Sequence, residues 1–596
     1  MASDSTTSLA TRPDKAFITG LPRWLILLVS LLSLAVLFGP GLVEHMQNAS
    51  DPYAFNNDAR MQIFPLLRYW DGALLQEDYV ADYFLGVMLP HGYSLFYGVL
   101  AQVFDPRNVS IVLPYILLAL TTAMVAAAAH KVSGATAAWC AAAFCLAADV
   151  YLGGMVGGLP RAFGAPVMAM VVLGLVYGNT ALLIAATLIG AAFYFTAGAV
   201  AGLCLATYLI LFPSSWRSDG GTWSWTRRLV LVGITGLLAI VIVSPTLIEA
   251  RAYGPSLNVE QADAYPEAGI GGRYKTYPMP PTFGLPSLEN LVDAAAVTMR
   301  AFRAREAFRS GDPLGGQGLY NFAEANLVVI TVIVMSLTAV GTLLSLGNAA
   351  VRRLLIVPAV GLLLFFLAYA LSPYLYFPNR PVGLTFPIVT GILFPAALIA
   401  ILRRIYGGRR HHRLVAPTVI ALSLVVIFLM GGRNTVVALN QYEAADEPVY
   451  EYVAGLPADV MIAGSPGDLI DNMSYLTGRS SLVGFEVHQA FHKGYVDEMR
   501  RRMMTVVDAL YADNTDPLIA LHDTWGVTHF IVDRRFYGRE DPKYFKPFDE
   551  AIAAGENGLN GTPAVLLQDA YATAFADGDI VVVDVGALAA DRAAGD

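Results

Sequence analysis

Residues 24–43 read WLILLVSLLSLAVLFGPGLV, a run that contains no charged residue. A helix of about 20 apolar residues is long enough to cross the hydrocarbon core of a bilayer. Arg12, Lys15 and Arg23 precede the run, and no Ala-x-Ala-like cleavage site follows it. These features favour an anchor helix with a cytoplasmic N-terminus, while a cleaved signal peptide is the alternative.

The composition of the whole chain agrees with a membrane protein. Of its 596 residues, 56% are hydrophobic and 14% are charged, whereas soluble domains carry about 25% charged residues. This balance excludes disordered, collagen-like and disulfide-rich proteins. The net charge of −9 offers no basic surplus for a nucleic-acid partner. The cysteines, Cys140, Cys145 and Cys204, lie in apolar runs without the spacing of a zinc site.

Further apolar stretches predict additional membrane spans, so that the chain is a polytopic α-helical membrane protein. Together with residues 24–43 they make about eleven transmembrane helices. Their approximate positions are residues 109–130, 134–152, 163–178, 181–196, 198–213, 229–249, 327–346, 354–372, 383–402 and 414–432.

Basic residues predict how these spans are oriented, because cytoplasmic loops are enriched in Lys and Arg. With the N-terminus inside, the basic clusters fall on inner loops, and the short outer loops carry only Arg161 and Arg380. The inner residues are His130, Lys131, Arg217, Arg227, Arg228, Arg352, Arg353, Arg403, Arg404, Arg409, Arg410 and Arg413. We therefore expect a multi-pass protein of the cell membrane whose C-terminal domain is periplasmic or extracellular.

This orientation divides the chain into three parts. Residues 1–23 form a cytoplasmic tail, residues 24–433 a transmembrane domain, and residues 434–596 a soluble α/β domain. Three long polar segments then lie outside: a first segment (residues 44–106), a second segment (residues 250–326) and a C-terminal segment (residues 434–596).

The first segment contains the most promising acidic residue, Asp58, in the sequence NNDAR. Apolar residues at helical spacing over residues 61–75 and 93–104 predict two helices along the membrane surface. One interpretation of Asp58 is an N-cap for the first of them. The other is a carboxylate at the membrane face, where an acceptor from water meets a donor from lipid. Further candidate substrate-binding residues in this segment are Glu44, Asp51, Arg60 and His91.

Two arginines in short outer loops are candidate phosphate ligands. Arg161 lies in the glycine-rich loop GGMVGGLPRAFGAP (residues 153–166), and Arg380 in SPYLYFPNRPVG (residues 372–383). Glycines let the backbone approach a ligand closely, and a guanidinium matches phosphate geometry. The alternative for Arg161 is a flexible turn with a snorkelling side chain.

The remaining outer sequence indicates structure more than chemistry. Residues 291–308 predict an arginine-bearing helix that lies on phospholipid headgroups or faces an anionic substrate. In the C-terminal segment, strand-like runs at residues 460–463, 481–485, 528–532, 564–567 and 580–585 alternate with helices. Glu486, His488 and His492 lie close together there, as ordinary loop residues or as a metal or acid/base group.

The order of these parts resembles the GT-C superfamily of integral-membrane glycosyltransferases, which includes protein O-mannosyltransferases, aminoarabinose transferases and oligosaccharyltransferases. The resemblance covers most of residues 24–433, and PHGYSLFY (residues 90–97) is similar to an HPP-L-YY stretch of some members. It implies transfer of a hexosyl or pentosyl group from a polyprenyl-phosphate carrier to a glycan, lipid or protein acceptor. It further implies Asp58 as base or acceptor-positioning carboxylate, with Arg161 and Arg380 holding the carrier phosphate.

Two departures from the family pattern refine this expectation. Oligosaccharyltransferases carry a further acidic pair in the second outer loop to hold a divalent metal, and residues 153–164 contain no acidic residue. We therefore expect no metal or other cofactor, although a divalent metal stays an option. The first segment has Asp58-Ala59 where related enzymes often have Asp-Glu.

Two other functional classes are compatible with the composition. A transporter or flippase for a lipid-linked glycan would need ionisable groups within the spans and internal repeats, and the sequence shows few of the former and none of the latter. A non-catalytic protein of envelope polymer assembly is the second alternative.

Overall fold

The structure is a computed structural model. It describes residues 23–212, 223–257, 264–269, 271–273, 327–370, 379–406, 412–429, 441–443, 448–538, 544–559, 564–568 and 571–595. Residues 1–22 of the predicted cytoplasmic tail and the arginine-bearing helix predicted at residues 291–308 lie outside these ranges.

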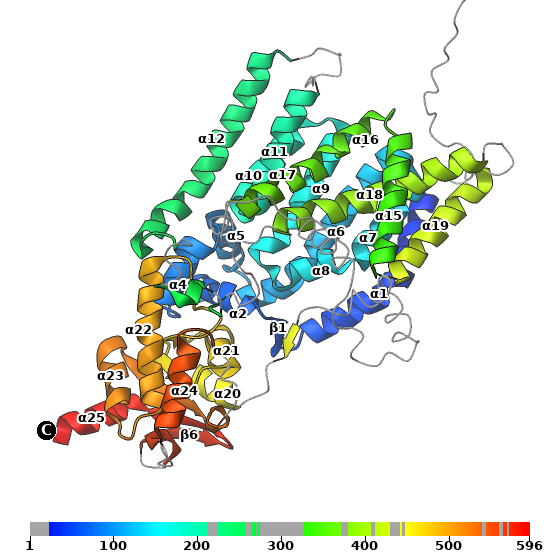
Figure 1. The fold of residues 1–596 in the computed structure, drawn as a ribbon. Helices are drawn as coiled ribbons and strands as arrows, with labels where there is room; N and C mark the ends of the chain where they lie inside the picture. Colours follow the sequence, from blue (N-terminus) through cyan, green and yellow to red (C-terminus); the bar gives the residue numbers. More distant parts are fainter. Residues whose placement is uncertain are drawn as a thin grey trace, which may run out of the picture.

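The apolar stretches form a layer of packed helices, which occupies the upper part of Figure 1. Each stretch predicted as a span coincides with one or two helices of this layer. α18 is its central helix and packs against α6, α7, α15 and α17. The helices are α1 (Arg23–Ala49), α6 (Pro106–Ser133), α7 (Ala135–Ala147), α8 (Asp149–Met155), α9 (Gly164–Tyr177), α10 (Thr180–Phe193), α11 (Phe195–Leu211), α12 (Trp225–Glu249), α15 (Leu327–Leu344), α16 (Ala349–Leu354), α17 (Ile356–Ala370), α18 (Asn379–Tyr406) and α19 (His412–Leu429).

Within the described residues, six helices are long and apolar enough to cross a membrane, and a bent pair formed by α7 and α8 is a seventh candidate. Only 11% of the most apolar part of α1 and of α12 is buried against the protein. Apolar surface that the protein does not cover must meet lipid, so the chain is a multi-pass membrane protein. α10 and α11, with 14 and 17 residues, are short for a span, and the number of about eleven spans stays a prediction.

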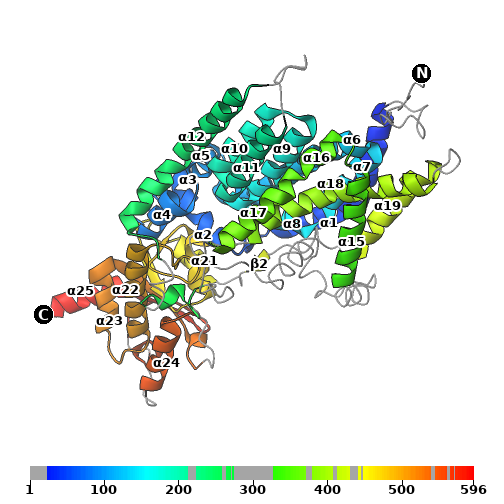
Figure 2. The same cartoon turned by 45° about the horizontal axis from the view of Figure 1, so that its top comes forward.

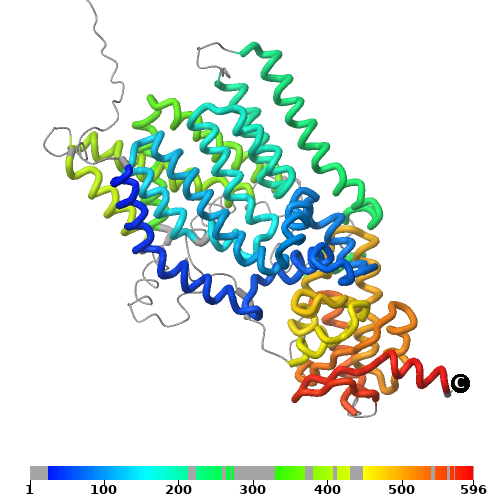
Figure 3. The backbone as a smooth tube through the Cα atoms, turned by 180° about the vertical axis from the view of Figure 1, so that it is seen from behind, coloured from blue at the N-terminus to red at the C-terminus, as the bar shows by residue number. Residues whose placement is uncertain are grey.

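The first segment folds into short pieces that lie between the helical layer and the C-terminal segment (Figure 3). They are β1 (Ala54–Asn56), α2 (Ala59–Gln62), η1 (Phe64–Leu66), α3 (Leu67–Trp70), α4 (Tyr79–Tyr83), η2 (Phe84–Met88) and α5 (His91–Leu100). The prediction of one surface helix over residues 61–75 is wrong. Pro65 has no N–H for a continuous helix, and the apolar stripe of Ile63, Leu66 and Leu67 is fully buried in protein. The second predicted helix corresponds to α5.

The C-terminal segment contains a five-stranded mixed sheet of order β4-β3-β5-β7-β6. β3 runs parallel to β4 and β5, whereas β7 runs antiparallel to β5 and β6. Ile462, Phe530 and Val582 of its strands are completely buried. The elements are α20 (Pro448–Ala454), β3 (Met461–Gly464), α21 (Asp468–Thr477), β4 (Ser480–Ser481), α22 (Lys493–Leu510), α23 (Asp516–Trp525), β5 (Val527–Asp533), α24 (Phe548–Gly558), β6 (Thr573–Asp577), β7 (Ile580–Asp584) and α25 (Val585–Gly595). The run at 564–567, predicted as a strand, is instead a 3₁₀ turn, η9 (Val565–Leu567).

A small second sheet ties the C-terminal segment to the first segment. β2 (Gln441–Glu443) pairs antiparallel with β1, and Phe55 lies opposite Tyr442. Figure 2 shows the C-terminal segment against α2 and α4 on one side of the helical layer. The residues around Asp58 therefore lie at the junction of the two parts.

Candidate active site

Asp58 and Arg161 are in direct contact. The guanidinium Nη1 of Arg161 donates to the Asp58 carboxylate, and the two side chains form an ion pair. Asp58 occupies the N-cap position of α2 but makes no capping hydrogen bond there. Its side chain is 28% exposed and that of Arg161 is 36% exposed. Both groups thus stay accessible to a substrate, and the carboxylate is directed to the arginine instead of to its own helix.

Asn56 orients both partners of this pair. Its side-chain oxygen accepts a hydrogen bond of 3.1 Å from the backbone N–H of Asp58 and one of 3.2 Å from Nη2 of Arg161. Asn56 is the last residue of β1 and is 3% exposed. The buried side-chain amide of Asn56 therefore sets the position of Asp58 in the first segment relative to Arg161 in the glycine-rich loop.

The conformation of the glycine-rich loop requires a glycine at position 157. Gly157 has a φ of +81°, and a Cβ atom there would lie 2.9 Å from Cβ of Asn56, so no other residue fits without displacing Asn56. The carbonyl of Gly158 accepts hydrogen bonds of 3.1 and 3.0 Å from the hydroxyls of Tyr93 and Tyr97. Burial raises the pKa of both tyrosines, which keeps them protonated as donors. The loop before Arg161 is thus held from two sides.

The other predicted site residues belong to different elements of the fold. Arg380 is exposed in the first turn of α18, and its role as a ligand of the carrier phosphate stays a prediction. His91 begins α5, with its Nε2 3.5 Å from the carboxylate of Glu249 near the end of α12. Glu44 and Asp51 are exposed, and Oδ1 of Asp51 accepts a 2.9 Å hydrogen bond from the N–H of Tyr53. These residues keep their substrate-binding roles only as predictions.

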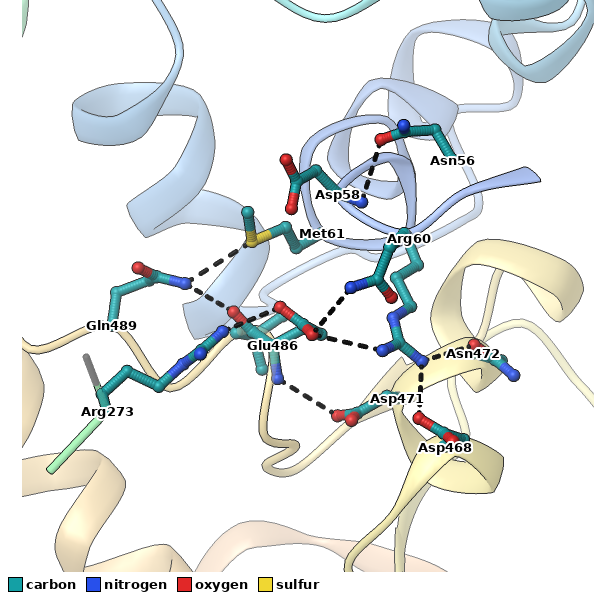
Figure 4. A network of polar contacts seen from close by, with 12 residues as sticks. Asn56, Asp58, Arg60, Met61, Arg273, Asp468, Asp471, Asn472, Glu486 and Gln489 are labelled. Carbon is teal, nitrogen blue, oxygen red and sulfur yellow. Dashed lines mark hydrogen bonds and ion pairs between the residues drawn. The ribbon is translucent and has the colours of Figure 1, made fainter. Parts of the chain in front are cut away.

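Arg60 is 4% exposed and points into the C-terminal segment (Figure 4). Its Nη1 donates to Asp468 at 3.2 Å and to Asn472 at 2.9 Å, and its Nη2 donates to Glu486 at 3.2 Å. The opposite oxygen of Glu486 accepts a 2.7 Å bond from Arg273 of the second segment. Arg60, a predicted substrate-binding residue, is thus occupied by protein carboxylates and amides in this structure.

Asp471 also belongs to this network and is half-buried. Loss of hydration, with further contributions from the carboxylates of Glu486 and Asp468, raises the pKa of Asp471 to about 7, although Arg60 opposes the shift. Its Oδ1 accepts a 3.3 Å hydrogen bond from the N–H of Glu486. A Cβ at Gly484 would lie 2.4 Å from the same oxygen, so a larger residue there would displace the Asp471 carboxylate.

The predicted group of Glu486, His488 and His492 does not assemble. His488 is fully buried among the rings of Tyr544, Phe545 and Phe548, and burial lowers its pKa to about 3. His492 instead lies with its Nδ1 3.0 Å from the hydroxyl of Tyr83. In the part of the chain that the structure describes, no three His, Cys, Asp or Glu side chains are placed to hold a metal ion.

No protein-family model and no curated protein matches the chain. Among solved structures, it is similar to ArnT from Cupriavidus metallidurans, with 14% identity, 94% of this chain and 98% of ArnT covered, and a TM-score of 0.47. It is also similar to the oligosaccharyltransferase AglB from Archaeoglobus fulgidus, with 12% identity, coverages of 92% and 73%, and a TM-score of 0.46. Arabinofuranosyltransferase AftD from Mycobacteria gives 12% identity, coverages of 96% and 40%, and a TM-score of 0.48.

Proposed function

We propose that this protein is a membrane glycosyltransferase that moves a sugar from a polyprenyl-phosphate carrier to an acceptor at the outer face of the membrane. The observation that carries the proposal is the ion pair between Asp58 and Arg161. It joins a potential base to a potential phosphate ligand, each from a different segment and each partly exposed. The pair lies where the apolar helices meet the polar C-terminal segment, the place at which a lipid-linked donor and a water-borne acceptor would meet.

The chemistry follows from these two groups. The carboxylate of Asp58 takes the proton of the acceptor hydroxyl while the acceptor oxygen forms a bond to the anomeric carbon of the sugar. The bond from that carbon to the carrier phosphate breaks, and the polyprenyl phosphate leaves with the electron pair. Arg161 stabilises the charge that grows on the departing phosphate, and we propose Arg380 as a second ligand for it. With arginines in this role, the reaction proceeds without a metal ion.

The test is release of free polyprenyl phosphate by the purified protein. The donor panel contains hexosyl and pentosyl derivatives of undecaprenyl and dolichyl phosphate, since ArnT was solved with undecaprenyl phosphate and AglB with a dolichol-phosphate. We expect release from at least one donor, a loss of about 100-fold or more in Asp58→Asn and Arg161→Ala, and no effect of a chelator. Asp71→Asn is the matched control, because Asp71 lies in the same segment and is exposed. Unchanged release in Asp58→Asn would contradict the assignment of the base.

A further inference from the structure

Residues 54–62, which include Asp58, have little regular structure of their own. They comprise the three residues of β1, a two-residue connection and the four residues of α2. So short a helix is not stable by itself, and the position of Asp58 therefore depends on contacts with other parts of the chain. The residues that flank Asp58 make these contacts.

One carboxylate oxygen of Glu486 accepts hydrogen bonds from the side chains of Asn57 and Arg60, which flank Asp58. Its Oε1 accepts a 3.3 Å hydrogen bond from Nδ2 of Asn57 and a 3.2 Å bond from Nη2 of Arg60. Figure 4 shows the Arg60 side chain running toward Glu486 and α21, whereas the Asp58 carboxylate points away from them. Glu486 thus holds the backbone on both sides of Asp58 and leaves its carboxylate free to meet Arg161.

The ionic contacts of Glu486 are shielded from water, which makes them strong. Glu486 is 7% exposed and Arg60 is 4% exposed, and Arg273 binds the second carboxylate oxygen at 2.7 Å. Buried charges interact more strongly than exposed ones, and removal of one partner leaves the others uncompensated. Glu486 therefore connects the first, second and C-terminal segments at one point.

α21 supplies a rigid support for this point. Arg60 binds the first turns of α21 through Asp468 and Asn472. At its other end, Nη1 of Arg107 donates to the carbonyls of Tyr475 and Leu476 at 3.3 and 2.9 Å. Arg107 belongs to the first turn of α6 in the helical layer. Both ends of α21 are thus held by arginines from outside the C-terminal segment, so its orientation relative to Asp58 is defined.

We propose that Glu486 is a positioning residue for Asp58, which acts through Asn57 and Arg60 to hold the carboxylate against Arg161. This inference rests on the proposed function, since it gives the C-terminal segment a part in the transfer step itself. Glu486 touches neither donor nor acceptor in this role. A misplacement of about 1 Å at a reacting group can lower a rate about 100-fold.

The experiment compares Glu486→Gln with Glu498→Gln in the full-length protein. Glu498 is a suitable control because it also binds several donors, Arg501, Arg502 and Trp525, all of them within the C-terminal segment. We expect both variants to lower the thermal unfolding midpoint. Only Glu486→Gln should lower kcat for polyprenyl phosphate release, by about tenfold or more, with KM for the donor changed less than about threefold.

Two further measurements separate positioning from general stability. In an Asp58→Asn background, Glu486→Gln should cause no additional loss, because the two changes act on the same step. Hydrogen exchange of the backbone amides of residues 56–60 should accelerate in Glu486→Gln and stay at the wild-type rate in Glu498→Gln.

The outcomes distinguish this inference from the proposed function. Equal kcat in the two Gln variants, or unchanged exchange at residues 56–60, would overturn the role of Glu486 while leaving Asp58 as the base. Full activity of Asp58→Asn would overturn both. Low kcat in Glu486→Gln, with faster exchange and no additive effect in the double variant, supports the inference.

Discussion

The Arg161 guanidinium is bound by the Asp58 carboxylate, 103 residues away in the sequence. In the proposed reaction the carrier phosphate needs the same guanidinium. Donor binding must therefore exchange one anion for another on Arg161, and this exchange releases Asp58 to accept a proton. In the proposed mechanism, the ion pair keeps Asp58 occupied until the phosphate arrives.

This competition predicts that Asp58→Asn binds undecaprenyl phosphate more tightly than the wild type. A partly exposed ion pair contributes about 1 kcal/mol, so the gain in affinity should be about fivefold. Calorimetric titration in detergent measures the affinity, with Asp71→Asn as the unaffected control. Equal or weaker binding by Asp58→Asn would show that the carboxylate does not compete with the phosphate.

The second prediction concerns Gly157. An alanine there must adopt a φ of +81° and push against Asn56, so Gly157→Ala should lower the free energy of unfolding by about 1–3 kcal/mol. It should also reduce transfer, because Asn56 orients both Asp58 and Arg161. Gly154→Ala in α8 is the control, since nothing lies within 4 Å of a Cβ at that position. Similar unfolding midpoints and activities in the two variants would disprove the role of the loop.

The third prediction follows from Asp471, whose pKa is raised to about 7 by loss of hydration. Between about pH 4, the ordinary pKa of an unfolded Asp, and pH 7, the folded state holds a proton that the unfolded state has lost. Stability from this group therefore decreases as the pH rises through this window.

Asp471→Asn keeps the acceptor oxygen for the N–H of Glu486 without the charge. The variant should match the wild type near pH 4 and exceed its stability above pH 7, by at most about 4 kcal/mol. Unfolding midpoints between pH 4 and 9 test this. Parallel pH profiles of wild type and variant would contradict the raised pKa.

The fourth prediction concerns Glu267 of the second segment, which is completely buried. Its two oxygens accept hydrogen bonds of 2.5 Å from Nε and Nη2 of Arg500 in α22. Glu267→Gln should reduce the free energy of unfolding by about 1–3 kcal/mol, because one arginine donor loses its acceptor. Arg501→Gln should cost less than about 1 kcal/mol, because Arg501 is 63% exposed in its pair with Glu498. A larger loss in Arg501→Gln than in Glu267→Gln would refute this ranking.

Local sequence patterns determine much of the helical layer. Each stretch predicted as a span is helical, because a run of apolar residues long enough to cross the membrane excludes most other structures. The first segment shows where such patterns stop being sufficient. The stripe of Ile63, Leu66 and Leu67 has the spacing of a surface helix, but the residues are buried against protein, and periodicity does not say which apolar partner covers a face.

The candidate site, too, could be predicted only in part from local sequence patterns. NNDAR predicts a cap or a functional carboxylate, and the glycine-rich loop predicts a close approach of the backbone to another group. Sequence proximity groups Glu486 with His488 and His492, because no local pattern links Glu486 to Arg60, 426 residues away. His488 is buried by the rings of Tyr544, Phe545 and Phe548, and Glu486 is ion-paired with Arg60, so both features depend on contacts between distant parts of the chain.

The sequence by itself therefore determined that this is a membrane protein with polar segments between apolar helices, since hydropathy is a property of contiguous residues. It also indicated Asp58 and Arg161, each from its own local context, and the family resemblance assigned both to one reaction. Only the tertiary structure decided that Asp58 and Arg161 touch, that Asn56 orients them, and that Glu486 holds the flanks of Asp58. These contacts join segments that are distant along the chain, so no local pattern predicts them and only chain folding brings the residues together.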